Sequence, residues 1–170
     1  ILIGLVGSEM CIRDRYETLQ AAVDAVQGSG TIELTSSIAL SDQVTIDSGK
    51  TIILDMNGET LSIGFSDSSK NLIVNNGTLT ITGDGTFDAT EATSYKGFIN
   101  NYGTLTVENG TFQIADKAMT VHLRNQDGGK AVINGGTFSG GATIVRSFEG
   151  SNTTITGGSF TNSVYPAVDV

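Results

Sequence analysis

Hydrophobic and polar positions follow two different periodicities along this chain. Within residues 16–27 the apolar positions fall at i, i+3, i+4 and i+7 (Leu19, Ala22, Val23 and Val26). This spacing places one apolar stripe on a helix, and the Gly-Ser-Gly sequence at residues 28–30 ends it. From Thr31 onward, short apolar alternations such as Val44-Thr45-Ile46 are interrupted by Gly, Asn, Asp and Ser. That pattern predicts many short strands joined by tight turns.

The strand-forming region contains an internal repeat. Its units are NNGTLTITGDGTF (residues 75–87), NYGTLTVENGTF (101–112), GGKAVINGGTF (128–138) and SNTTITGGSF (151–160). Gly77, Gly103 and Gly129 follow one another at equal intervals. The interval from Ile133 to Ile155 is shorter, and the one from Leu54 to Ile81 is slightly longer. A repeat of variable length is typical of stacked coils that differ only in their loops.

We therefore predict an all-β fold, a right-handed parallel β-helix with about 20–27 residues per coil and an N-terminal capping α-helix. Equivalent apolar residues of successive coils would form inward columns and one continuous core. The helix would cover the first coil, which otherwise exposes a sheet edge. A leucine-rich repeat has a similar period but needs a motif that is absent here, and a β-sandwich would not produce matching columns.

Three segments follow from these patterns. Residues 1–15 contain LVGSEMCIRD (5–14), which resembles the translation of a transposase adapter used in sequencing-library preparation, so we expect a non-native segment. The alternative is a genuine strand followed by a short basic stretch. Residues 16–30 form the predicted capping helix and turn, and residues 31–170 the β-helix. Because the strand-like pattern is still running at Val170, we expect an internal piece of a longer, C-terminally truncated protein.

Charge and composition narrow the classes of partner. The net charge is −9, which disfavours nucleic acid because a nucleic-acid site needs a basic patch. A single cysteine, Cys11, excludes an intrachain disulfide. The chain has no apolar run long enough to cross a bilayer, so no transmembrane segment is expected.

The order of motifs resembles a known family. LQAAVDAVQGSGTIEL (residues 19–34) is followed by GKTIILDMNGETL (49–61) and then by the repeated GTLTI and GTF units. Over residues 16–170 this resembles the pectin-lyase-like β-helices of large bacterial surface proteins. The resemblance implies an extracellular or cell-surface location in a bacterium. It is specific for fold rather than function, since the same scaffold carries lyases, hydrolases, phage tailspikes and adhesins.

The sequence lacks the residue groups that enzymes of this family use. The resemblance implies acidic clusters that hold calcium beside an Arg or Lys base in lyases, and grouped aspartates with Gly-His-Gly and Arg-x-Lys elements in hydrolases. Neither element occurs in the sequence, and Asp84, Asp88 and Glu91 flank a glycine, as is typical of turn residues. We therefore predict no catalytic residue, no metal site and no cofactor.

Four residues are candidates for ligand contact. If Val121 and Leu123 point inward, strand alternation places His122 and Arg124 outward. Leu72, Phe98 and Arg124 also recur at the interval of the repeated glycines, and Arg146 follows at the shorter interval of the last unit. Phe98, His122, Arg124 and Arg146 would then line one outer face suited to a glycan. The alternative is that the loops at residues 62–71 and 88–96 fold over Leu72 and Phe98.

A second spacing predicts a structural feature. Asn75, Asn101 and Asp127 recur at the same interval as the glycines. If they point inward or into a bend, we expect their side chains to stack between coils.

We expect the chain to function by presenting a surface to a partner rather than by catalysing a reaction. The leading hypothesis is a non-catalytic extracellular module, a stalk or an adhesive surface that contacts a host or matrix glycan or protein. The alternative is part of a carbohydrate-active enzyme, a polysaccharide lyase or glycoside hydrolase, whose catalytic coils lie elsewhere. A third hypothesis, a tailspike-like trimer, needs an extensive apolar outer face, of which the sequence shows little. The pattern leaves the oligomeric state open.

Overall fold

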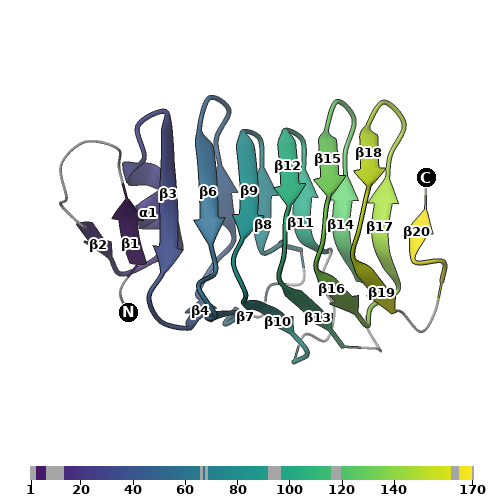
Figure 1. Ribbon diagram of the computed structural model, residues 1–170, viewed down its shortest axis with the longest axis horizontal. Coiled ribbons are helices and arrows are strands. Elements are labelled where there is room, and N and C mark those ends of the chain that lie inside the picture. Colours follow the sequence, from purple (N-terminus) through teal and green to yellow (C-terminus); the bar gives the residue numbers. More distant parts are fainter. Residues whose placement is uncertain are drawn as a thin grey trace.

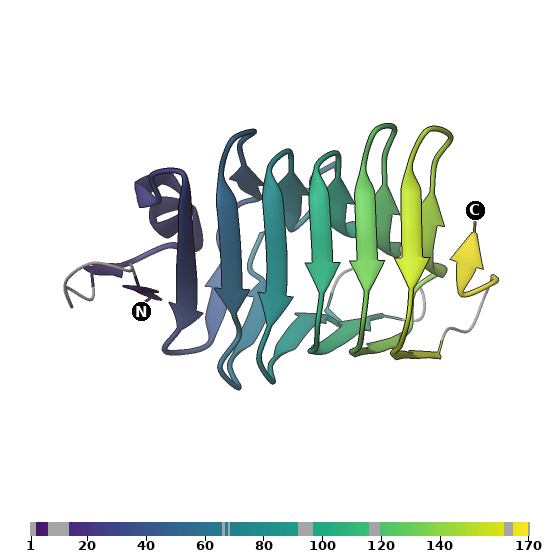
Figure 2. The same cartoon turned by 45° about the horizontal axis from the view of Figure 1, so that its top comes forward.

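The chain folds as a parallel β-solenoid of about five turns (Figures 1 and 2). The computed structural model describes residues 3–6, 14–65, 67, 69–91, 97–115, 120–161 and 165–169. Strands of successive coils lie side by side along the long axis of the molecule. The predicted all-β parallel β-helix is confirmed. Within the described residues, no helix is long and apolar enough to cross a membrane.

Three sheets form the walls of the solenoid, and each coil contributes one strand to each sheet. Sheet A contains β18 (Asn152–Ile155), β15 (Lys130–Ile133), β12 (Thr104–Val107), β9 (Thr78–Thr82), β6 (Thr51–Asp55), β3 (Ser29–Leu34), β1 (Ile3–Val6) and β2 (Asp14–Tyr16). Sheet B contains β19 (Ser159–Thr161), β16 (Thr137–Ser139), β13 (Thr111–Ile114), β10 (Thr86–Ala89), β7 (Thr60–Ile63) and β4 (Ile38–Leu40). Sheet C contains β20 (Val168–Asp169), β17 (Thr143–Ser147), β14 (Val121–Asn125), β11 (Gly97–Asn101), β8 (Ile73–Asn75) and β5 (Val44–Ile46).

The strand register of sheet A confirms the sequence repeat. Leu105 lies opposite Leu79 on one side and Ala131 on the other, and all three are buried. Ile133 pairs in the same way with Ile155 of the next coil. The glycine that precedes each of these strands is required by close approach: a Cβ atom on Gly103 would clash with the carbonyl oxygen of Gly77.

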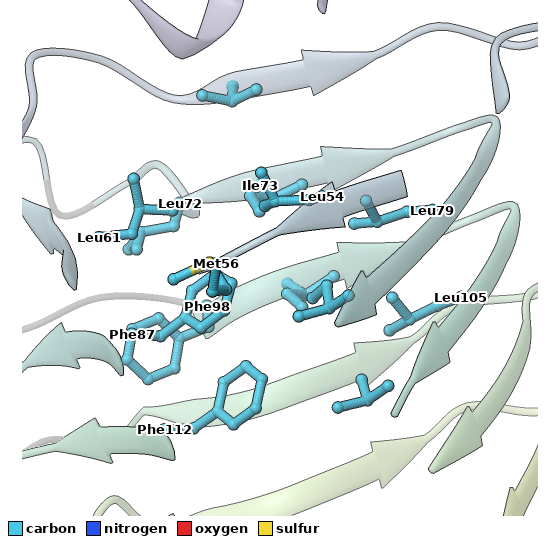
Figure 3. Close-up of a cluster of buried hydrophobic side chains, with 14 of the residues drawn as sticks. Leu54, Met56, Leu61, Leu72, Ile73, Leu79, Phe87, Phe98, Leu105 and Phe112 are labelled. Carbon is cyan, nitrogen blue, oxygen red and sulfur yellow. The ribbon is translucent and has the colours of Figure 1, made fainter. Parts of the chain in front are cut away.

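The core is a set of parallel columns, one of which is aromatic. Phe112 stacks on Phe87 at 4.6 Å and on Phe138 at 4.5 Å between ring centroids, and Phe160 continues the column at 5.1 Å. Figure 3 shows Phe87 and Phe112 beside the neighbouring Phe98. Phe87 and Phe112 are fully buried, so this column supplies a large share of the apolar area removed from water.

A second buried column is polar. Asn75 Nδ2 donates to Asn101 Oδ1 at 2.7 Å, and Asn101 Nδ2 donates to Asn125 Oδ1 at 2.8 Å. Asn125 Nδ2 then donates to Thr153 Oγ1 at 2.8 Å. All three asparagines are fully buried. The predicted stack of side-chain amides therefore exists, but its third member is Asn125 rather than Asp127, which is exposed.

Helix α1 (Leu19–Ala25) precedes the first coil and is shorter than the predicted span of residues 16–27. Thr18 begins it, because its Oγ1 accepts a hydrogen bond from the Ala21 amide at 3.1 Å. The predicted apolar stripe, Leu19, Ala22, Val23 and Val26, is buried in the core.

Two side chains attach α1 to the coils. The Gln20 amide pairs with the edge of β5: the Thr45 amide donates to Gln20 Oε1 at 2.7 Å, and Gln20 Nε2 donates to the Thr45 carbonyl at 3.1 Å. Lys50 Nζ donates to the carbonyls of Val23, Asp24 and Val26 at 2.8–3.0 Å. A cation at this end is favourable because helix C-termini carry unpaired carbonyls and a partial negative charge.

Replacing Lys50 with methionine is expected to lower the free energy of unfolding by about 2 kcal/mol, because three carbonyl acceptors lose a charged donor. Chemical denaturation followed by circular dichroism measures the loss. Lys130, exposed on β15, offers the matched Lys130→Met control. Equal stability of both variants would show that Lys50 does not hold the helix.

The N-terminal segment is described only in part. β1 pairs antiparallel with β2 and with β3, where Leu5 lies opposite Ile32. Residues 1–2 and 7–13, which include most of the adapter-like sequence, lie outside the described residues. The non-native origin of residues 1–15 stays a prediction.

Candidate contact face on sheet C

The outer face of sheet C carries the candidate site. Its strands align Val74, Asn100, Arg124 and Arg146 in one outward column, and Asp169 follows on β20. Arg124 and Arg146 are therefore direct neighbours across two strands, as predicted. The residues before them in this column differ from the prediction.

Phe98 does not belong to this face. In the register of β11 and β14, Asn100 lies opposite Arg124 and Ile99 opposite Leu123. The interval between these coils is shorter than the one between the repeated glycines, because the connections of the fourth coil are shorter. Phe98 lies in the core with 1% of its surface exposed, and so does Leu72. Both are core residues in their own right, while residues 66, 68 and 92–96 of the loops expected to cover them lie outside the described residues.

His122 is also wrongly placed by the prediction. It is 1% exposed, with its ring 5.5 Å from that of Phe98 and 5.9 Å from that of Phe138. The strict alternation fails at the start of the sheet C strands, where three consecutive residues of β11, β14 and β17 are buried, including pairs that alternation would place on opposite faces. Such pairs are Leu72 and Ile73, Phe98 and Ile99, His122 and Leu123, and Ile144 and Val145. His122 therefore cannot contact a ligand on the outer face.

A hydrogen-bonded group adjoins the arginine column. Gln126 Nε2 donates to Asn100 Oδ1 at 2.5 Å, and Asn100 Nδ2 donates to the Tyr102 hydroxyl oxygen at 3.3 Å. Tyr102 is 48% exposed and is among the most exposed large hydrophobic side chains of the described residues. Asn100, itself bonded by Gln126, holds the phenol at its hydroxyl group and leaves the ring available to solvent.

The arginines are oriented by their neighbours. The Arg124 guanidinium lies 5.4 Å from the centre of the Phe148 ring, within the range of a cation–π contact. Arg146 Nε donates to Asp169 Oδ2 at 3.0 Å, in a pair whose side chains are about half exposed. Such an exposed pair contributes little to stability but fixes where the charge lies.

We call Asn100, Tyr102, Arg124, Gln126, Arg146 and Phe148 the contact face. It offers amide and guanidinium donors beside an exposed aromatic ring. Tyr102, Gln126 and Phe148 were missed because each depends on the correct register. They directly follow Asn101, Asn125 and Ser147, which face inward as one aligned column.

Two of the three acidic residues considered as catalytic candidates, Asp84 and Asp88, make hydrogen bonds at the connections between strands. Asp84 Oδ1 accepts from Asn109 Nδ2 at 2.6 Å, and Asp88 Oδ1 accepts from the Thr90 amide at 2.9 Å. The latter is a turn of the kind expected from the sequence. Within the part of the chain that the structure describes, no three His, Cys, Asp or Glu side chains are grouped to hold a metal ion.

Comparison with known proteins found no matching family model, no matching curated protein and no matching solved structure. The solenoid fold rests on the strand register described above, and the contact face is the feature of the molecule that bears on function.

Proposed function

We propose that the chain is a non-catalytic, extracellular β-helix module of a bacterial surface protein and that its contact face binds a glycan. The resemblance to pectin-lyase-like surface proteins supports the proposed extracellular location on a bacterium. The observation that carries the proposal is the exposed ring of Tyr102, whose hydroxyl oxygen accepts from Asn100, the residue opposite Arg124 in the strand register. Sugars are recognised by stacking of their apolar faces on aromatic rings together with hydrogen bonds to their hydroxyl groups.

The face suits binding better than bond cleavage. Glycoside hydrolysis normally needs two carboxyl groups placed on either side of the scissile bond. The carboxylate that the described residues place in this column is Asp169, which is already paired with Arg146. The remaining groups of the contact face are amides, a phenol, a phenyl ring and guanidinium groups rather than carboxyl groups.

Replacing Tyr102 with alanine is expected to weaken glycan binding about tenfold, which corresponds to about 1.4 kcal/mol. The probe is an array of immobilised oligosaccharides, followed by titration calorimetry of the best ligand with the complete chain. Ile53→Ala is the matched control, because Ile53 is 40% exposed on the outer face of sheet A, away from the contact face. Gln126→Ala should give a smaller loss because it removes the support rather than the ring.

Equal weakening by Tyr102→Ala and Ile53→Ala would contradict the assignment of this face. Binding to none of the arrayed glycans would overturn the proposal that the ligand is a glycan.

A further inference from the structure

His122 joins the fourth coil (β12 to β14) to the fifth (β15 to β17). Its ring lies on β14 and packs against Phe138 of β16, and its Nε2 lies 3.1 Å from the Gly140 carbonyl oxygen. On the other side it packs against Phe98 of the third coil. In the tautomer that donates from Nε2, the imidazole acts as an aromatic core residue with one hydrogen bond across the boundary between coils.

The surroundings of this ring are suited only to its neutral form. Nδ1 is buried and has no hydrogen-bond partner within the described ranges. Among the described residues, β11, β16 and the Gly140–Ala142 connection contain no titratable side chain. Arg124 and Arg146, on β14 and β17, belong to the outward column. No carboxylate described by the structure therefore faces His122 to accept a hydrogen bond from a second ring N–H or to balance its charge.

We propose that His122 makes the contact between the fourth and fifth coils sensitive to acid. When its imidazole is protonated, the solenoid opens between these two coils. Protonation would place a buried charge between Phe98 and Phe138 with no carboxylate among the described residues to balance it, which is strongly unfavourable. The least costly response is to expose the ring by separating Phe138 and Gly140 from it. This inference does not depend on the proposed glycan binding.

The solenoid architecture allows opening at a single boundary. Each coil of a solenoid contacts only its neighbours, so a group of terminal coils can separate while the rest stays folded. The fifth coil is itself well packed, with Ile133 and Ile144 both 0% exposed, so we expect it to separate as a folded unit.

The pH range follows from the direction of the pKa shift. Burial lowers the pKa of His122 from 6.5 to about 4, and hydrogen bonding to the backbone of Gly140 and Ser139 offsets only part of this shift. Because the pKa of His122 is lower in the closed form, the open form binds the proton more tightly. The free-energy preference for the closed form is therefore at its maximum above pH 6.5. This preference falls as the pH drops toward 4. Between pH 7 and pH 5 the ratio of open to closed molecules should rise about 20- to 30-fold.

The test is a pH titration of the complete chain by NMR. His122 is the single histidine of the sequence, so its ring resonance is unambiguous. We expect it to remain neutral in the closed form until well below pH 6. Amide resonances of β15 to β20 should broaden between pH 6 and pH 4.5, while those of β3 to β9 stay unchanged.

The matched variant is His122→Phe, which keeps an aromatic ring between Phe98 and Phe138 but cannot be protonated. We expect its β15 to β20 resonances to survive to pH 4.5. His122→Leu provides a second non-titrating variant should the larger ring disturb the fold. Titration of the wild-type ring near pH 6.5 with all amides intact would overturn the proposal. So would equal loss of the terminal coils in wild type and both variants.

Discussion

Replacing Asn101 with leucine is expected to lower the free energy of unfolding by about 3–5 kcal/mol, although the two side chains are similar in size. Asn101 Nδ2 donates to Asn125 Oδ1 at 2.8 Å and to the Lys130 carbonyl at 3.1 Å, and its Oδ1 accepts from Asn75. Leucine would leave buried partners without hydrogen bonds on both sides. Each such group costs about 1–3 kcal/mol.

Urea denaturation of Asn101→Leu and Asn100→Leu measures this effect. Asn100 is the outward neighbour on the same strand, so its replacement should cost less than about 1 kcal/mol. Asn101→Asp tests the two hydrogen bonds of the asparagine column separately, because a carboxylate still accepts from Asn75 but cannot donate to Asn125. If Asn101→Leu were no worse than Asn100→Leu, the buried amides would not stabilise the fold.

Truncating Phe112 to alanine should cost a similar amount, about 3–5 kcal/mol. The ring is stacked between Phe87 and Phe138 at 4.6 and 4.5 Å, and it is 1% exposed. Its removal leaves a cavity that two rigid strands cannot close. The loss should therefore exceed that of Phe160→Ala, because Phe160 has one stacking partner among the described residues and is only half-buried.

Calorimetry of Phe112→Ala, Phe160→Ala and Thr111→Ala distinguishes these positions. Thr111 points outward beside Phe112 and should change stability by less than about 0.5 kcal/mol. Equal effects of the two phenylalanine variants would mean that the column does not act as a stack of neighbouring contacts.

The fold was predictable because the same motif returns in each coil. Gly103, Leu105 and Val107 repeat the chemistry of the preceding coil, and strands with identical inward residues pair in one register. Leu54 and Ile81 pair as expected even though the interval between them is longer than in the coils that follow. In sheet A the local sequence pattern agrees with the pairing of strands between coils. The spacing of the repeat was therefore enough to predict the strand register there.

The candidate site was only partly predictable, because it depends on connections whose length varies. Transferring the spacing of sheet A to sheet C paired Phe98 with Arg124, whereas the structure pairs Asn100 with it. The same transfer selected Asp127 in place of Asn125. His122 was assigned to the surface because strict alternation was extended to the start of β14. Arg124 and Arg146 were aligned correctly because the shorter interval between Ile133 and Ile155 in sheet A is the same between these two arginines in sheet C.

The buried asparagine column also limits how such a chain can change length. Each amide donates toward the following coil, so the hydrogen bonds of Asn75, Asn101 and Asn125 all run in one direction. Amides aligned in this way polarise one another. A coil inserted between them preserves the series only if it brings its own asparagine at this position. Growth or shortening by whole coils is therefore tolerated, whereas a coil lacking the amide interrupts this series of hydrogen bonds, as Ile46 and Ser147 do at its two ends.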